Sequence, residues 1–226
     1  MFKKIKNKIL SKLNYYSSSH IIWPEIDYEL INFKERGLLS GKILNAGAGW
    51  RKLDHLVQGE LINQDITWPE DKRTHIHIYS PIHKIPVDDN TFDAIICLAV
   101  LEHVENPIDI VKEFHRVLKP SGYCIASVPF LQPEHKCPTD FQRYTRDGLV
   151  YLFKNNGFEV SESYCLFNVY HTLHWILTEY FSLFKNKRMQ ILKWFVLISI
   201  GRLAKKSNLK SDIISTAFQV LAKKIT

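Results

Sequence analysis

Short apolar runs of strand length alternate with helical patterns through the middle of this chain. Residues 107–118 carry the clearest helical pattern, with Pro107 suited to its first turn, and a second helical segment at 147–156 ends at Gly157. Strands that alternate with helices build a parallel sheet covered on both faces, so the sequence predicts an α/β fold with a doubly wound, mostly parallel sheet. The apolar runs are rich in Ile, Val and Leu and lie at residues 42–46, 60–66, 75–79, 92–98 and 122–128.

The last part of the chain has a different pattern. Segments near 169–184 and 189–206 are predicted to be apolar, aromatic helices with basic ends. Within these two segments the longest run without Asp, Glu, Lys or Arg, Val169 to Thr178, has 10 residues, far fewer than the roughly 20 that a membrane-spanning helix needs. The strand-like segment TAFQVLAKK follows. The sequence therefore predicts a helical insertion at about 169–210, before a last strand that returns to the sheet.

The formal net charge is +7, and it is unevenly distributed along the chain. Residues 1–14 carry five lysines and residues 180–211 carry eight lysines and arginines, both without an acid, so the rest of the chain has a net charge of −6. An acidic central part argues against nucleic acid as a partner. The basic flanking segments instead suit an anionic membrane surface.

Residues 1–40 are predicted to form a separate lead-in, a basic amphipathic segment followed by a helix. Phe2, Ile5, Ile9 and Leu13 recur at helical spacing among lysines, a pattern typical of a helix that contacts a membrane and equally of a solvated terminus. No secretory signal is evident, and the four cysteines form no CxxC pair. We therefore expect reduced thiols, no metal site, and a cytoplasmic protein that could make peripheral contact with the inner face of the membrane.

Two glycines mark the end of the first apolar run, in the stretch KILNAGAGWRKLDH at residues 42–55. Gly47 and Gly49 remove side chains and tolerate the positive φ of a sharp turn, at a strand end where ligands bind in this type of sheet. A dinucleotide pyrophosphate would need a third glycine where Lys52 stands, so that interpretation is weak. Asp65 closes the second apolar run, where a carboxylate can accept both hydroxyls of a ribose.

Five segments in this order resemble the class I S-adenosylmethionine-dependent methyltransferases, and among them the group known as type 11. The segments are KILNAGAG, the strand that ends at Asp65, IPVDDNTFDAIICLAVLEHV, the helix with RVLKPSG, and CIASVPF. The resemblance covers about residues 41–165, and TAFQVLAKK is similar to the last strand of the family. It implies a Rossmann-like sheet of seven strands with an antiparallel last strand, in a domain that spans residues 41–226.

The resemblance also implies an activity. S-adenosylmethionine would be the cofactor, and its methyl group would pass to a small-molecule or glycan- or lipid-linked acceptor by O-methylation. The stretch PFLQPEHKCPTDFQRYTRDGLVYLFKNNGFEV is similar to methyltransferases encoded among surface-polysaccharide and cell-envelope genes. The alternative is a catalytically weak or inactive methyltransferase fold that acts as a membrane-associated binding or assembly factor, and nucleic-acid methylation is a minor third hypothesis.

The implied cofactor residues lie at the ends of the predicted strands. Two positions depart from the family pattern: Asn45 stands where the family usually has an acid, and Tyr79-Ser80-Pro81 stands where an aspartate commonly receives the adenine amino group. Both departures could weaken cofactor binding and keep the inactive alternative open. The implied residues are Ala46, Gly47 and Gly49 under the methionine and ribose, Asp65 at the ribose hydroxyls, Ile66 and Ile82 on the faces of the adenine, and Leu98 and Ala99 near the sulfonium.

Four side chains near the predicted acceptor end are candidates for catalysis: His103 after the fourth strand, and His135, Asp140 and Arg143 in the loop after the fifth. Methyl transfer from a sulfonium mainly needs alignment, but a hydroxyl acceptor also benefits from a base. Structural alternatives exist, since His103 could cap the local turn or pack under the helix, and Arg143 could pair with Asp140 and only hold the loop. Glu102 is expected to orient its neighbours rather than to react.

Overall fold

The computed structural model describes residues 27–67 and 72–225. The predicted amphipathic helix of residues 1–14 lies outside this part of the chain and stays a prediction. Helix α2, Asp27–Glu35, precedes the first strand. Its Leu30 and Phe33 are fully buried in the same apolar cluster as Ile43 of that strand, so the helix covers one face of the sheet.

Seven strands form one sheet in the order β3-β2-β1-β4-β5-β7-β6. Neighbours among β1 to β5 pair in parallel, and the last strand runs antiparallel. The predicted doubly wound, mostly parallel sheet with an antiparallel last strand is therefore confirmed. The strands are β1 Ser40–Ala46, β2 Gln58–Asp65, β3 Ile78–Tyr79, β4 Phe92–Leu98, β5 Leu118–Pro129, β6 Phe158–Leu166 and β7 Ala217–Lys224.

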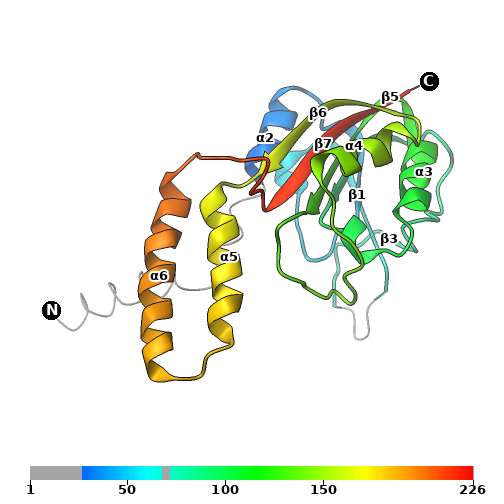
Figure 1. The fold of residues 1–226 in the computed structure, drawn as a ribbon. Coiled ribbons are helices and arrows are strands. Elements are labelled where there is room, and N and C mark those ends of the chain that lie inside the picture. Colours follow the sequence, from blue (N-terminus) through cyan, green and yellow to red (C-terminus); the bar gives the residue numbers. More distant parts are fainter. Residues whose placement is uncertain (1–26, 68–71, 226) are drawn as a thin grey trace, which may run out of the picture. The chain divides into compact units, whose positions relative to one another are not determined.

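Helices cover both faces of the sheet, with α2 on one side and α3 and α4 on the other (Figure 1). Residues 94–98 of β4 are buried without interruption, as expected for a parallel strand covered on both faces. Helix α3 begins at Pro107, where a missing N–H costs no hydrogen bond, and packs Val111 and Phe114 into the core. The remaining elements of this part are α3 Pro107–Val117, α4 Arg146–Lys154, and the short 3₁₀ turns η2 Asp54–Leu56 and η3 Leu101–His103.

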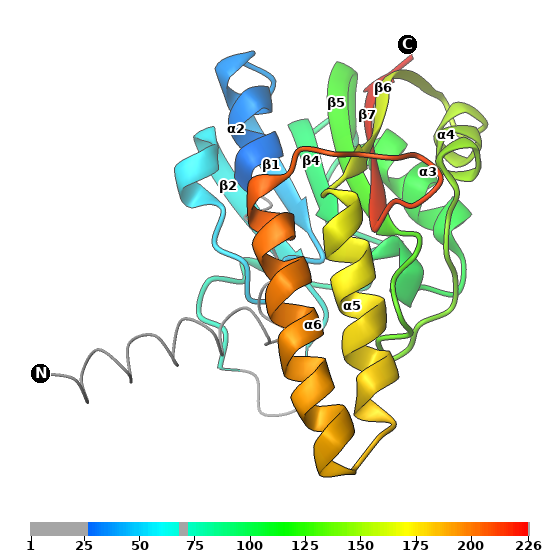
Figure 2. The ribbon, with the colours of Figure 1, turned by 60° about the vertical axis from the view of Figure 1, so that its left-hand side comes forward.

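The strand order places β1 and β4 next to each other at the centre of the sheet, as Figure 2 shows. The chain continues from β1 toward β2 on one side and from β4 toward β5 on the other. In such sheets the crevice at the carboxyl ends of the two central strands is the usual ligand site. The residues that follow β1, β2 and β4 therefore meet at one edge.

The third strand is shorter than predicted, because the run at 75–79 forms a strand only at Ile78–Tyr79. One backbone bond remains before this strand, from the N–H of His77 to the carbonyl of Asn63 (2.8 Å), and side chains supply the others. The Asn63 amide donates to the carbonyl of His75 (3.0 Å), and the N–H of Asn63 donates to Nδ1 of His77 (2.9 Å). Bonding of this kind leaves a strand-like pattern in the sequence but interrupts the strand itself.

The fifth strand is longer than predicted and begins at Leu118, within the residues expected to form a turn. Ser121 has a positive φ of 62°, and the pairing with β4 shifts register between Phe92 and Ala94. The predicted turn is thus an irregularity at the start of the strand, which explains why a turn-like sequence lies inside it.

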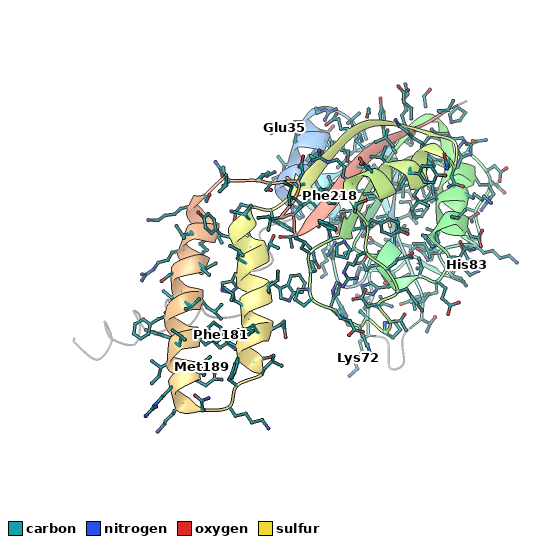
Figure 3. All side chains as sticks on the ribbon, viewed as in Figure 1. Glu35, Lys72, His83, Phe181, Met189 and Phe218 are labelled. Atoms are coloured by element: carbon teal, nitrogen blue, oxygen red, sulfur yellow. The ribbon has the colours of Figure 1, made fainter. Side chains whose placement is uncertain are left out.

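The described chain divides into two compact units, and the predicted helical insertion falls in the smaller one. The Asn168 amide donates to the carbonyl oxygens of Ala204 and Ser207, both at 2.7 Å, and so ties the two helices of the insertion together. Phe181 and Met189 lie at the other end of the pair (Figure 3). None of the described helices is both long and apolar enough to cross a membrane. The two helices are α5 Val169–Ser182 and α6 Lys187–Lys206.

Candidate active site

The chain turns sharply at the carboxyl end of β1. Gly47 and Gly49 have φ values of 67° and 57°, which L side chains rarely adopt. A Cβ on Gly47 would lie 2.6 Å from Cγ2 of Val100, whereas a Cβ on Gly49 would meet no atom within 4 Å. Gly47 therefore lets the turn pack against the residues after β4, and Gly49 leaves open space over the backbone.

Asp65, at the carboxyl end of β2, faces this turn. Its Oδ2 accepts the N–H of Gly49 (2.7 Å) and a guanidinium N–H of Arg73 (2.5 Å), and its Oδ1 accepts the N–H of Ile66 (2.7 Å). The side chain of Asp65 is 10% exposed and that of Arg73 is 1% exposed. A carboxylate has about four acceptor sites, so Oδ1 keeps one for a further donor.

Arg73 is a site residue that sequence reasoning missed. Besides Asp65, its guanidinium binds the carbonyl oxygens of Gly49 (3.5 Å) and Ile66 (2.8 Å), and Nε2 of His75 lies 3.1 Å from the same Gly49 oxygen. These contacts hold the glycine turn and the end of β2 together. Nothing in the local sequence distinguishes this arginine among the 30 lysines and arginines of the chain.

The two departures from the family pattern have structural partners. Gln64 connects the loop after β3 to the glycine turn, because its Nε2 donates to the Ser80 carbonyl (2.7 Å) and its Oε1 accepts the N–H of Gly47 (3.2 Å). Asn45 is 3% exposed, and its amide donates to Oδ1 of Asn63 (2.8 Å). Asn45 thus bonds within the sheet and does not line the cleft beside the turn.

This cleft collects most of the predicted cofactor residues at the carboxyl ends of β1, β2 and β4. Ala46 is the exception, because it is fully buried in β1. Sequence reasoning did not single out Trp50 and Arg51, which also line the cleft and follow the glycine turn directly. The predicted residues that line the cleft are Gly47, Gly49, Asp65, Ile66, Ile82, Leu98 and Ala99.

The tip of β4 bends where it meets the cleft. Ala99 has a positive φ of 56°, unusual for a residue with a Cβ, and its N–H donates to the carbonyl of Ser127 (2.9 Å). The carbonyl of Leu98 accepts a hydrogen bond from Arg51 (3.2 Å). Strained residues of this kind cluster at functional sites, and here the bend brings the end of β4 to the cleft wall.

The loop after β5 is bonded to the turn η3, which follows β4. The Gln142 amide donates to the carbonyl oxygens of Leu101 and Val104 (3.0 and 2.9 Å), and Nδ1 of His103 lies 2.5 Å from the carbonyl oxygen of Thr139. The loop therefore has a fixed position beside His103, which lines the cleft.

Glu102 lies between the two histidines of this region, and its side chain is fully buried. The Nε2 atoms of His103 and His135 each lie 3.6 Å from its Oε1, and their ring centroids are 5.2 Å apart. Within the described part of the chain, no donor forms a hydrogen bond with either carboxylate oxygen of Glu102. Burial raises the pKa of Tyr144 to about 12, and the charge of Glu102 adds to this shift.

Asp140 and Arg143 form an ion pair next to His135. The guanidinium donates to both carboxylate oxygens of Asp140, and these bonds lower the pKa of Asp140 to about 2. Asp140 also accepts the N–H of His135 (2.8 Å). The pair thus holds the loop, as the structural alternative anticipated, and the same bonds position His135. Of the four predicted catalytic residues, His103 alone is a lining residue of the cleft.

The cleft offers groups that suit an adenosyl sulfonium. Asp65 has an acceptor position for a ribose hydroxyl, and the open backbone at Gly49 allows a ligand to approach closely. Ile66 is 43% exposed and Ile82 also lines the cleft, so both could contact an adenine ring. At the β4 side, His103 supplies an imidazole to the lining of the cleft.

Known sequences match the central part of this chain. Residues 50–126 match the family model of a methyltransferase domain. Cycloartenol-C-24-methyltransferase 1 of Oryza sativa subsp. japonica is 39% identical over 57 residues, which are 25% of this chain and 16% of that protein. An uncharacterized protein of Methanocaldococcus jannaschii is 28% identical over 155 residues, which are 66% of this chain and 68% of that protein. The chain thus covers only a small part of the Oryza enzyme.

Solved structures share the fold over most of the chain. A SAM-dependent methyltransferase from Aquifex aeolicus is similar with a TM-score of 0.53 at 17% identity, over 95% of this chain and 98% of that one. The [4+2]-cyclase SpnF is similar with a TM-score of 0.56 at 14% identity, over 88% of this chain and 82% of that one. One fold thus supports more than one chemistry, and the activity depends on the residues of the site.

Proposed function

Because the chain belongs to the class I S-adenosylmethionine-dependent methyltransferase family, we propose that it transfers a methyl group to a hydroxyl of a small-molecule or glycan- or lipid-linked acceptor. S-adenosylmethionine is the cofactor of this domain. The cofactor supplies an activated methyl group, so the residues of the chain have two tasks. They align the acceptor with that methyl group, and they take up the proton of the acceptor hydroxyl.

The cofactor would occupy the side of the cleft formed by β1 and β2. Asp65 would bind a ribose hydroxyl through Oδ1, because Oδ2 already accepts two hydrogen bonds. Ile66 and Ile82 would contact the adenine. The sulfonium would then lie toward Leu98 and Ala99, at the end of the cleft where His103 is also found.

The observation that carries this function is the position of His103. It lines the cofactor cleft, and its ring is held between the Thr139 carbonyl and the buried carboxylate of Glu102. A fixed imidazole beside a buried carboxylate and a second imidazole, that of His135, is suited to activating a hydroxyl. General acid–base catalysis of this kind contributes about 10²–10⁴ in rate.

The alternative of an inactive assembly factor is not favoured. It depended on the two departures from the family pattern, and both have structural partners here. Asn45 bonds within the sheet, and the loop with Ser80 is bonded to Gln64. The glycine turn and Asp65, on which cofactor binding depends, are in place.

Methyl transfer is tested by incubating the full chain with S-adenosylmethionine and one acceptor class at a time. Free sugars, glycans, lipid-linked glycans and quinols represent these classes, and the release of S-adenosylhomocysteine is measured. We expect release with at least one hydroxyl-bearing class, loss of release in His103→Asn, and no change in His83→Asn. His83 is a matched control, because it is an exposed histidine that does not line the cleft (Figure 3). Turnover confined to acceptors that carry only amines would contradict the hydroxyl assignment.

Peripheral contact with an anionic membrane is the second part of the proposal. Leu183, Ile191 and Phe195 of the helical pair are 75%, 58% and 59% exposed. Exposed apolar side chains among cations are typical of surfaces that insert into an anionic membrane interface. The exposed cations at the same end of the pair are Lys185, Lys187 and Arg188.

Liposome flotation tests this contact. We expect binding to vesicles with anionic lipid that weakens as the salt concentration is raised. At 0.1 M salt, interactions between exposed charges are largely screened beyond about 10 Å. Leu183→Ser should reduce the floated fraction, and Tyr151→Ser is the matched control, because Tyr151 is 69% exposed on α4. Equal recovery in the soluble fraction with and without anionic lipid would exclude the contact.

A further inference from the structure

Glu102, His103 and His135 form a cluster in which one carboxylate and two imidazoles face a common point. The two Nε2 atoms lie 3.6 Å from Oε1 of Glu102, and one ligand atom from each residue lies within 4.8 Å of the others. The carboxylate is fully buried, and no donor in the described residues forms a hydrogen bond with it. A buried carboxylate in this state is costly unless something else compensates its charge.

The distances in this cluster suit metal coordination better than hydrogen bonding. A hydrogen bond between an imidazole and a carboxylate would bring the two atoms to about 2.7–3.2 Å. The ligands of a tetrahedral site lie about 2.0–2.2 Å from the metal ion, which separates neighbouring ligands by about 3.3–3.6 Å. The observed 3.6 Å separations fall at the upper end of that range.

The orientation of His103 also matches that of a metal ligand, which usually donates its other ring N–H to a carbonyl or a carboxylate. Nδ1 of His103 lies 2.5 Å from the Thr139 carbonyl, and a carbonyl can only accept. The proton of His103 is therefore on Nδ1, and Nε2 presents its lone pair to Glu102.

The second histidine has a more complex environment. Nδ1 of His135 lies 3.4 Å from Nη2 of Arg143, which can only donate, and 3.8 Å from Oδ2 of Asp140, which can accept. Without an ion, Nδ1 of His135 therefore accepts and Nε2 carries the ring proton. A metal ion on Nε2 would require that proton to move to Nδ1, on the side of Asp140. Asp140 and Arg143 are bonded to each other through both carboxylate oxygens, so their charges offset one another near this ring. With neutral histidines the group has a net charge of −1 from Glu102, which favours a cation.

We propose that Glu102, His103 and His135 bind one first-row divalent transition-metal ion, with zinc as the probe. Two imidazoles and one carboxylate suit zinc and its neighbours, whereas magnesium and calcium prefer oxygen ligands only. Three protein ligands leave a coordination position for water or an acceptor oxygen, and His103 lines the cleft. With the ion bound, both ring nitrogens of His103 are occupied, so the ion rather than His103 would activate the acceptor hydroxyl. This activation rests on the proposed methyl transfer, but metal binding itself does not.

The site is tested on chelator-treated, full-length protein without cofactor. Calorimetric titration with zinc chloride should give one ion per chain, and titration with cobalt chloride should give the visible absorption of a four- or five-coordinate site. Glu102→Gln and His135→Asn should each weaken zinc binding by about 100-fold or more, and Asp140→Asn by about 10-fold. His83→Asn should keep the original affinity, since His83 is exposed and lies outside the cluster.

The metal site would be overturned by no zinc binding in the original protein, or by unchanged zinc affinity in Glu102→Gln and His135→Asn. Loss of binding in a control variant would also overturn it, because the ion would then be held elsewhere. Circular dichroism and binding of S-adenosylhomocysteine show that each variant is folded. Zinc binding without methyl transfer would support the metal site and contradict the proposed function. Methyl transfer without zinc binding would support the proposed function and contradict the metal site.

Discussion

The two carboxylates at the carboxyl edge of this sheet have opposite surroundings. Asp65, at the end of β2, accepts three hydrogen bonds and pairs with a guanidinium that is almost fully buried. Glu102, in the turn after β4, is fully buried and accepts none from the described residues. Buried polar groups are usually hydrogen-bonded, so the exception points to a role beyond folding.

The difference between these two carboxylates indicates that the two sides of the cleft have different roles. The β1–β2 side is complete without a ligand, because the turn at Gly49, Asp65 and Arg73 hold one another in place. The β4 side has its geometry fixed by the loop after β5, but its central charge lacks a donor. We therefore assign cofactor binding to a preformed surface and acceptor activation to a group that requires a partner.

Removing each carboxylate should have opposite effects on stability. Asp65→Ala leaves the guanidinium of Arg73 buried without its anion, so we expect a loss of about 3–5 kcal/mol in the free energy of unfolding. Glu102→Gln removes a buried charge that has no donor, so we expect no loss, or a gain. Urea unfolding in the presence of a chelator measures both. Similar losses of unfolding free energy in the two variants would contradict the proposed difference between Asp65 and Glu102.

Variants on the β4 side and on the β1–β2 side of the cleft should also have different effects on kcat and KM. His103→Asn is expected to lower kcat by about 100-fold or more with little change in KM for S-adenosylmethionine, because the variant loses acceptor activation but keeps the cofactor surface. Asp65→Asn is expected to raise that KM by about 10- to 100-fold, because it weakens a hydrogen bond to a charged group. Steady-state rates over a range of cofactor concentrations test both. An increase in KM confined to His103→Asn would reverse the assignment.

A smaller effect on stability should distinguish Gly47, in the turn after β1, from Gly37. Gly47 and Gly37 both have positive φ, 67° and 75°, but a Cβ on Gly37 would meet no atom within 4 Å. Gly37→Ala should therefore cost about 1 kcal/mol for its backbone conformation alone. Gly47→Ala should cost about 1–3 kcal/mol more, because its Cβ would collide with Val100. Equal shifts of the urea midpoint would mean that the turn does not pack as described.

The sequence was sufficient to predict the site residues whose positions follow from a local pattern of residues. Gly47 and Gly49 follow an apolar run, and Asp65 ends the next one, so the architecture alone brings them to one edge of the sheet. The third strand is predicted too long, because its alternating pattern does not reveal that the side chains of Asn63 and His77 form part of its bonds to β2.

Contacts between distant segments could not be predicted in the same way. The bond between Arg73 and Asp65 depends on how the chain returns to the end of β2. Glu102 was expected only to orient its neighbours, because its burial between two imidazoles arises when Gln142 fixes the loop after β5 on η3. The sequence predicts no metal site because its four cysteines form no CxxC pair, whereas the ligands proposed here come from η3 and the loop after β5.

Calorimetric titration with S-adenosylhomocysteine tests the central claim most directly. The original protein should bind one molecule with a dissociation constant in the micromolar range or below. Asp65→Asn should bind about 10- to 100-fold more weakly, and Glu102→Gln should bind as the original does. No binding by the original protein, or equal affinity in Asp65→Asn, would contradict the assignment of this cleft to the cofactor.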